Sequence, residues 1–334
     1  MAAERQGRPA RLGDIAREAG VHVSTVSRVL NGSADVAVRP ETRARIIETA
    51  RRLRYRPNAM ARGLRLQQTG TLGVLGGPLR NPLWSQIIHG AFDQARSRGY
   101  VVLVAERTDD PSALDGYERL VSEARIDGML VLSGDAPDGG LVGLAESGFP
   151  TVFAGRGVAG SDRNVLMDEE AAVRLAVSHL SESGHSAIGY IEGPAELDTT
   201  RRRIEALARV LGERGLSAEV CHAPHSESGG YAAVEALLPA GVVTACVIAG
   251  FSQTIGGLAA ARRAGLQLPA ELRVVTYDDE PILDYIYGSV TSIRMPLSEL
   301  GSVAVDTLID QIEGASPKDV VLATPPELVT RANA

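Results

Sequence analysis

Two short apolar stripes separated by one glycine constrain the N-terminal part of this 334-residue chain most strongly. Apolar residues recur there at helical spacing, at Ile15, Ala16, Ala19, Val21, Val26, Val29 and Leu30. The pattern predicts two short helices joined by a tight turn, with Gly20 in the left-handed conformation. Ala16 is small where the helices would cross, and Val26 would fill the angle between them. This is the spacing of a helix-turn-helix.

A third helix is predicted from Pro40, because proline suits a first helical turn. Its apolar face is expected to contain Ile46, Ile47, Ala50 and Leu53. The second helix carries polar and basic side chains on the face away from its apolar stripe, at Ser24, Thr25, Ser27, Arg28 and Asn31. Such hydrogen-bond donors favour a helix that lies in a DNA groove over the alternative, a helical bundle that binds no DNA.

The run DIAREAGVHVSTVSRVLNG, followed by YRPNAMARGL, resembles the DNA-binding headpiece and hinge of the LacI/GalR family. The resemblance implies base contacts in the major groove by Val23, Ser24 and Arg28, and arginine can donate two hydrogen bonds to guanine. Val23 has an alternative place in the headpiece core. The resemblance also implies phosphate contacts, which fix register and not sequence, by Thr25, Ser27 and Asn31.

One position departs from the family pattern. His22 stands where the family usually has a serine that caps the recognition helix. We expect either a weaker cap or an imidazole that contacts a DNA phosphate.

The headpiece is assigned to residues 1–57, and residues 58–69 resemble the family's hinge helix and linker. The hinge is too short to be stable alone. The resemblance implies that it forms when two subunits lie side by side on DNA, with Leu64 inserted between base pairs from the minor groove. The alternative is a plain linker in which Leu64 has no such role.

Charge is distributed unevenly along the chain. Residues 1–70 contain 14 arginines and six acidic residues, a net charge of +8, whereas the rest carries 20 basic and 35 acidic residues, a net charge of −15. Only the first part should therefore be attracted to a phosphate backbone, and we expect its DNA binding to weaken steeply with added salt.

From Thr71 onward, short apolar strands alternate with helical stretches, including a predicted helix from Asp115 to Ala124. Two such series predict an α/β core of two Rossmann-like subdomains with a cleft between them. The order resembles the family's core, which is similar to periplasmic sugar-binding proteins. The family's crossings place subdomain one at about 70–165 and 295–322, and subdomain two at about 166–294 and 323–334.

The cleft candidates follow from this resemblance. Trp84 matches an aromatic residue that stacks on the ligand, and Arg203 and Asp278 match a ligand-binding arginine and acid. Because a buried Asp278 without a counter-charge would be costly, Arg203 or a ligand donor is its expected partner. Thr199 and His225 are further candidates. Ordinary packing for Trp84 and a solvated charge run for Arg203 are the alternatives.

The cleft also departs from a sugar site. Gly250 and Phe251 replace a family asparagine and aspartate, Met295 replaces a glutamine, and Gly155 stands where an acid often occurs. Sugar hydroxyls would lack partners there. We therefore expect Phe251 to face a flatter, partly apolar effector, such as a nucleoside or an aromatic metabolite, rather than a sugar. The alternative is a core that has lost its ordinary sugar response.

Several function classes are not supported by the sequence. No phosphate-binding GxxxxGK loop, HExxH, GxSxG or acidic metal cluster occurs, so we expect no enzyme, cofactor or metal site. Cys221 and Cys246 are expected to be buried free thiols. We find no signal peptide or membrane span and expect a cytoplasmic, nucleoid-associated protein. A solute-binding protein would lack the headpiece.

Together these features predict a transcriptional regulator that acts as a repressor. It would bind a near-palindromic operator in double-stranded DNA as a homodimer, with its affinity set by a small-molecule effector. The alternative is a DNA-binding regulator whose core acts constitutively or through a protein partner.

Overall fold

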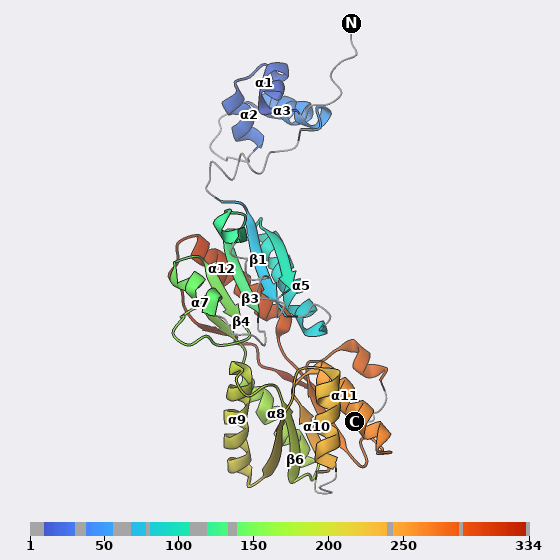
Figure 1. Ribbon diagram of the computed structural model, residues 1–334. Coiled ribbons are helices and arrows are strands. Elements are labelled where there is room, and N and C mark those ends of the chain that lie inside the picture. The colour runs from blue at the N-terminus through green and yellow to red at the C-terminus, as the bar shows by residue number, and fades with distance from the viewer. Residues whose placement is uncertain are drawn as a thin grey trace. The chain divides into compact units, whose positions relative to one another are not determined.

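The computed structural model describes residues 10–30, 38–55, 68–77, 81–106, 119–132, 139–238, 243–286 and 290–331. The chain forms two compact units, Met1–Thr69 and Gly70–Ala334, and each is considered by itself (Figure 1). The predicted fold class, a helical headpiece followed by an α/β core, is confirmed.

The first unit contains α1 (Leu12–Ala19), α2 (Val23–Leu30) and α3 (Pro40–Arg52). Its core consists of small and branched apolar side chains, namely Ile15, Ala16, Ala19, Val26, Val29, Ile46 and Ala50. Gly20 ends α1 with a φ of 63°, and its N–H bonds to the Ala16 carbonyl, so the predicted left-handed turn is confirmed.

The predicted apolar face of α3 is wrong at Ile47. Its side chain is 36% exposed, whereas Ile46 and Ala50 are buried and Leu53 packs against them. A step of about 100° per residue turns Ile47 away from the line that joins Ile46 to Ala50. Thr49 is buried on that line instead.

The second unit contains two six-stranded sheets. The first has the order β11-β5-β4-β3-β1-β2, with all described pairs parallel. Its strands are β1 (Thr71–Gly76), β2 (Val101–Glu106), β3 (Gly128–Leu132), β4 (Thr151–Ala154), β5 (Asn164–Leu166) and β11 (Val320–Val321). Helices α5 (Pro82–Ser97), α7 (Gly139–Glu146) and α12 (Leu297–Ile312) belong to this half (Figure 1).

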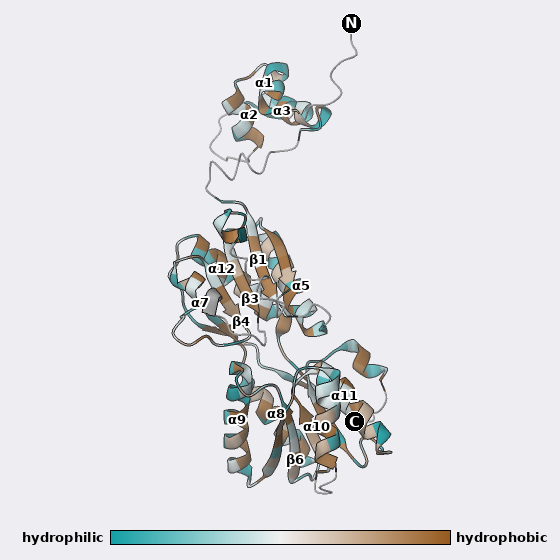
Figure 2. Ribbon diagram, in the orientation of Figure 1, coloured by the Kyte–Doolittle hydropathy of each residue, from teal (hydrophilic) through white to brown (hydrophobic). Residues whose placement is uncertain are grey.

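The second sheet has the order β12-β10-β9-β8-β6-β7 and is parallel except where β12 meets β10. Its strands are β6 (Ala187–Glu192), β7 (Ser217–His222), β8 (Ala245–Ile248), β9 (Arg273–Tyr277), β10 (Thr291–Arg294) and β12 (Glu327–Val329). Around it lie α8 (Glu169–Glu182), α9 (Asp198–Arg214), α10 (Glu227–Leu237), α11 (Phe251–Arg263) and the 3-10 turn η2 (Pro281–Asp284). Figure 2 shows brown, hydrophobic residues along β1 and β3, and both strands are buried.

The chain passes between the halves after β5, after β10 and after β11. Because strands of both halves point their carboxyl ends toward these passages, the loops that follow the strands meet between the sheets.

Helices α5 and α12 pack closely across the first half. A Cβ atom on Gly90 would clash with the Ser298 carbonyl, and one on Gly301 would clash with the Ile87 carbonyl. Glycine at both positions therefore sets the approach of α5, whose first turn carries Trp84, to α12.

Cys246 is buried as predicted, but Cys221 is only partly buried, because β7 is an edge strand. Only the end of the predicted Asp115–Ala124 helix, from residue 119, falls within the described residues. None of the described helices is long and apolar enough to cross a membrane.

Candidate functional site

The outer face of α2 is open to solvent. His22, Val23, Ser24 and Arg28 are exposed, and Thr25 and Ser27 are half-buried, whereas Val26 and Val29 lie in the core (residues 22–29). Val23 is 42% exposed, so the alternative that placed it in the headpiece core is wrong. Asn31 and Leu64 lie outside the described residues.

The His22 imidazole takes the place of the serine cap. Ser24 donates its backbone N–H to His22 Nδ1 at 3.3 Å, and the Ser24 hydroxyl lies 2.8 Å from the same nitrogen. The Ser24 amide is one of the N–H groups that a helix start leaves without an intrahelical partner. Because Nδ1 accepts this bond, the neutral ring carries its proton on Nε2. A histidine thus serves as the cap of α2.

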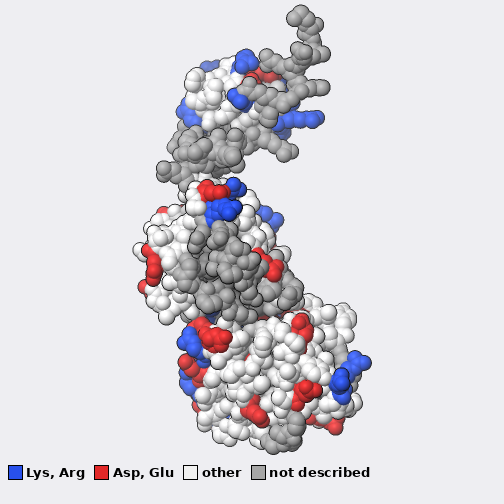
Figure 3. Space-filling model, in the orientation of Figure 1, with Lys and Arg blue, Asp and Glu red and all other residues white. Residues whose placement is uncertain are grey.

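Arginines dominate the charge of the headpiece. Figure 3 shows several arginine side chains and few acidic ones on the described face of this unit. The Arg28 guanidinium folds back only through Nε, which donates to the Ser24 carbonyl at 3.3 Å. Neither Nη group of Arg28 has a partner among the described residues, so both could bind a group outside the helix.

The core holds a cavity of about 150 Å³ between the two sheets. It is lined by all six residues predicted for effector binding, namely Trp84, Thr199, Arg203, His225, Phe251 and Asp278. The three positions with unusually small or apolar residues, Gly155, Gly250 and Met295, line it as well. Residues that are far apart in the sequence, from Trp84 to Met295, therefore line one cavity.

Trp84 reaches the cavity from the first turn of α5. Asn81 caps this helix by accepting the Leu83 N–H at 3.1 Å, and Pro82 begins it. The indole is buried, and a Cβ atom on Gly77 would lie 2.8 Å from its ring. Nε1 of Trp84 has no hydrogen-bond partner in the described part of the chain. The ring is held by packing, and its N–H is free for a ligand acceptor.

Arg203, in the second turn of α9, is not paired with Asp278 as expected. Its Nε donates to Glu169 Oε2 at 2.6 Å, and its Nη1 lies 3.7 Å from Glu192 Oε1. The guanidinium also lies 4.1 Å from the centre of the Tyr277 ring. Glu169 and Glu192 are more deeply buried than Asp278 and need the counter-charge more. Arg203 therefore neutralises two buried glutamates and is not the unpaired ligand-binding arginine that was expected.

Asp278 directly follows β9 and lines the cavity with a φ of 68°. Burial raises the pKa of its carboxyl group to about 7, against the opposing effect of Arg203. No described residue donates a hydrogen bond to this carboxylate. The cavity is therefore lined by a buried carboxyl group that no described residue satisfies.

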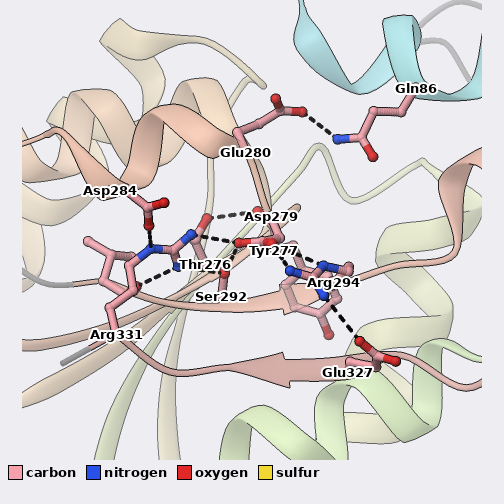
Figure 4. Close-up of polar contacts among 11 residues, drawn as sticks. Gln86, Thr276, Tyr277, Asp279, Glu280, Asp284, Ser292, Arg294, Glu327 and Arg331 are labelled. Atoms are coloured by element: carbon pink, nitrogen blue, oxygen red, sulfur yellow. Dashed lines mark hydrogen bonds and ion pairs between the residues drawn. The ribbon is translucent and has the colours of Figure 1, made fainter.

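The neighbouring Asp279 takes the nearby arginines. Arg294 Nη2 and Arg331 Nη2 each lie 2.7 Å from its carboxylate oxygens, and Ser292 donates its hydroxyl at 2.6 Å (Figure 4). Burial opposes the ionisation of Asp279, but these hydrogen bonds outweigh it and lower its pKa. The two arginines are consequently not available to Asp278.

Glu169 and Gln253 are among the lining residues that were not predicted from the sequence. Glu169, at the start of α8, has an Oε1 atom without a hydrogen-bond partner among the described residues. Gln253 of α11 donates from Nε2 to the carbonyls of Ala223 and Glu192, which leaves its Oε1 unpaired in the same sense. The sequence shows only that Glu169 begins an apolar helix and that Gln253 follows β8 by a few residues. Both patterns are common, so neither identifies a cavity residue.

Two contacts join the halves beside the cavity. Gln86 of α5 donates to Glu280 Oε1 at 2.7 Å, as Figure 4 shows, and the Gly157 N–H donates to Asp198 Oδ2 at 2.6 Å. A change in the relative position of the halves must break or remake these bonds. The described residues contain no cluster that could hold a metal ion.

Comparisons with known proteins agree with this architecture. Residues 11–58 match the model of bacterial regulatory proteins of the lacI family, and residues 177–332 match a periplasmic binding protein-like domain. The transcriptional regulator MalR of Streptomyces coelicolor is 32% identical over 97% of this chain and 96% of its own. The repressor PurR of Edwardsiella ictaluri is 28% identical, with 95% of each chain covered.

A solved structure is similar along the whole chain. The Lac repressor dimer bound to operator and the anti-inducer ONPF is 27% identical, with a TM-score of 0.82 and coverage of 98% of this chain and 99% of that one. These relatives are regulators and not enzymes, in agreement with the prediction. On the sequence match along the whole length and on the shared fold, the chain belongs to the LacI family of DNA-binding transcriptional regulators.

Proposed function

We propose that the chain is a repressor that binds a near-palindromic operator as a homodimer and responds to a small molecule in the core cavity. The cavity carries this proposal, because its lining comes from both halves of the core. A ligand that fits only one arrangement of the halves shifts DNA affinity by its difference in binding energy between the arrangements.

The DNA-contacting residues are assigned on the exposed face of α2. Val23, Ser24 and Arg28 contact base edges, and the two Nη groups of Arg28, which no described residue binds, suit a guanine. The phosphate contacts fall to His22, Thr25, Ser27 and Asn31, with Leu64 as the minor-groove wedge. The contact of Nδ1 with the Ser24 amide supports the assignment of His22, because it leaves Nε2 as the ring nitrogen that can donate to a phosphate.

A homodimer is supported by exposed apolar side chains on the first half of the core. Val101 and Leu103 of the edge strand β2 are 67% and 39% exposed, and Phe92 of the adjacent α5 is 44% exposed. Burial of this surface between two copies would hold two headpieces on one operator. Replacement of Val101 and Phe92 by serine should shift the sedimentation coefficient toward that of a monomer.

The effector is proposed to be flat and partly apolar, such as a nucleoside or an aromatic metabolite. Phe251, Gly250, Gly155 and Met295 give the cavity few groups for sugar hydroxyls, and Trp84 adds a second aromatic ring. Calorimetry with a panel of hexoses and nucleosides tests this assignment, and strong binding of a simple hexose would contradict it.

The whole proposal is tested by genomic footprinting of the protein, which we place at the nucleoid in the cytoplasm. Footprints should fall on near-palindromic sites, and the neighbouring genes should name the pathway and the effector. Operator affinity is then measured with and without metabolites of that pathway. An operator affinity that no metabolite changes would favour a core that acts constitutively or through a protein partner.

A further inference from the structure

The cavity has more hydrogen-bond acceptors and negative charges than its own residues satisfy. Its walls contain carboxylates from α8, α10 and the loop after β9, namely Glu169, Glu227 and Asp278, against one arginine, Arg203. Glu192 and Glu280 add two more carboxylates beside this set. This excess of carboxylates over arginines limits which ligands the cavity can bind.

Nearby arginines do not correct the imbalance. Arg203 donates to Glu169 and lies 3.7 Å from Glu192, and burial raises the pKa of Asp278 in spite of the opposing charge of Arg203. Arg202 bonds to Asp198 at 3.1 Å and comes no closer than 3.9 Å to Glu169. Arg294 and Arg331 form ion pairs with Asp279, as the dashed contacts in Figure 4 show.

The unsatisfied atoms are mainly acceptors. Glu169 Oε1 and Gln253 Oε1 are buried without a partner among the described residues, and both side chains line the cavity. The Asp278 carboxylate lines it too and receives no hydrogen bond from those residues. A buried acceptor without a donor is costly, and a buried carboxylate without a cation is more so. A ligand rich in N–H donors would remove all three costs together.

We propose that the effector presents a cationic nitrogen group with several N–H donors, such as an amidinium or a protonated amino-heterocycle, to Asp278, Glu169 and Gln253. This inference rests on the proposed effector function and adds the charge of the ligand to it. The aromatic rings of Trp84 and Phe251 line the same cavity and favour a flat cation over a flat anion. The free indole N–H of Trp84 accommodates one acceptor elsewhere on the ligand.

The pKa of Asp278 supports the assignment. Burial raises this pKa to about 7, so the carboxyl group of the free protein is partly protonated near neutral pH. A cation binds the ionised form and must displace that proton. Other charged or titratable groups line the cavity or lie beside it, namely Arg203, Glu169, Glu192, Glu227, Glu280 and His225. A variant of Asp278 is therefore needed to isolate its contribution to the pH dependence.

The test uses calorimetry on the full chain with three ligands of one shape, benzamidine, benzamide and benzoate. We expect benzamidine to bind at least about tenfold more tightly than benzamide, and benzoate more weakly still. Benzamidine stays cationic across pH 5.5–8.5. Its affinity should therefore rise by up to about tenfold per pH unit below pH 7 and level off above it.

Asp278→Asn should reduce benzamidine binding to the level of benzamide and flatten the pH profile between pH 5.5 and 7. Asparagine tolerates the positive φ at this position, so the variant keeps the backbone. The control is Glu235→Gln, which removes the same charge from an exposed position on α10 and should change nothing. A Glu169→Gln variant gives a second measurement in which the preference for benzamidine should shrink.

Equal affinities for benzamidine and benzamide, tighter binding of benzoate, an affinity that falls as pH rises, or no binding of any of the three would overturn the inference. Operator affinity is measured in the same samples. If benzamidine binds as expected but leaves operator affinity unchanged, the charge of the site stands and its role as an effector site fails. If another, uncharged metabolite occupies the cavity and alters operator affinity, the function stands and this inference fails.

Discussion

The substitution Asp278→Asn should stabilise the empty protein at alkaline pH. The pKa of this buried carboxyl group rises from 3.8 in an unfolded chain to about 7 in the fold, so the fold prefers the protonated form. The contribution of the protonated carboxyl group to the free energy of unfolding is fully present below about pH 4. It falls as the pH rises toward about 7 and is lost above that pH. A difference of this size corresponds to a destabilisation on the order of 4 kcal/mol above pH 8.

The asparagine side chain carries no charge and also suits a φ of 68°. The variant should therefore gain stability over the parent at pH 8.5 and differ little from it at pH 4.5. Urea unfolding followed by tryptophan fluorescence measures this difference, because Trp84 is the single tryptophan and lies in the same cavity.

Glu235→Gln controls for the loss of one negative charge from an acidic core, and it should show no pH-dependent gain. The reasoning would be refuted by a variant that is equally stabilised at both pH values or less stable than the parent at pH 8.5. In either case Asp278 would have to be compensated in the empty protein by a partner that the fold does not show.

Four further predictions concern other parts of the chain. Arg28→Ala should cost about 1–3 kcal/mol of operator binding in fluorescence anisotropy and relax the preference for one base, while binding to random DNA should change little. Leu64→Ala should reduce operator affinity and bending, as read by gel mobility, and unchanged bending would leave the wedge without support. Glu169→Ala should destabilise the core by about 3–5 kcal/mol in urea unfolding, because Arg203 loses its closest partner in a buried site. Operator binding should weaken linearly on a plot of log affinity against log salt concentration, by about 0.9 per phosphate contact, and a flat response would contradict the headpiece contacts.

The local features of the fold could be predicted from the sequence because they depend on neighbouring residues. Gly20 and the stripes beside it predict the turn between α1 and α2, and β1 to β4, β6, β8 and β9 each contain a short apolar run. The helix α12 was not predicted, although it packs against α5 and is bounded in the sequence by Pro296 and Gly314. Ile47 shows the opposite error, since an apolar side chain next to a stripe was assigned to the core.

The residues of the cavity were predicted more successfully than their pairing. Resemblance to a family assigns positions, and the six assigned side chains line one cavity. The partner of Arg203 depends on which acids are most deeply buried once α8, α9 and β6 pack together. That ranking is a property of long-range contacts between residues 169, 192 and 203, and no local pattern in the sequence reports it.

The three acids that follow β9 divide separate tasks within one short segment. Asp278 lines the cavity, Asp279 binds the arginines Arg294 and Arg331, and Glu280 accepts the bond from Gln86 across the halves. Asp279 is anchored on both sides by β10 and the C-terminal segment, so it fixes the backbone on which its two neighbours sit. A ligand that draws Asp278 into an ion pair therefore acts on a segment whose next residue but one holds the contact between the halves. Besides burial, which is the main cause, the negative charge of Glu280 also raises the pKa of Asp278, so a cation bound to Asp278 acts electrostatically on the acid that accepts the Gln86 bond. We therefore expect occupancy of the cavity and the Gln86–Glu280 bond to be coupled through charge. This coupling gives the core a physical route from ligand charge to the arrangement of its halves.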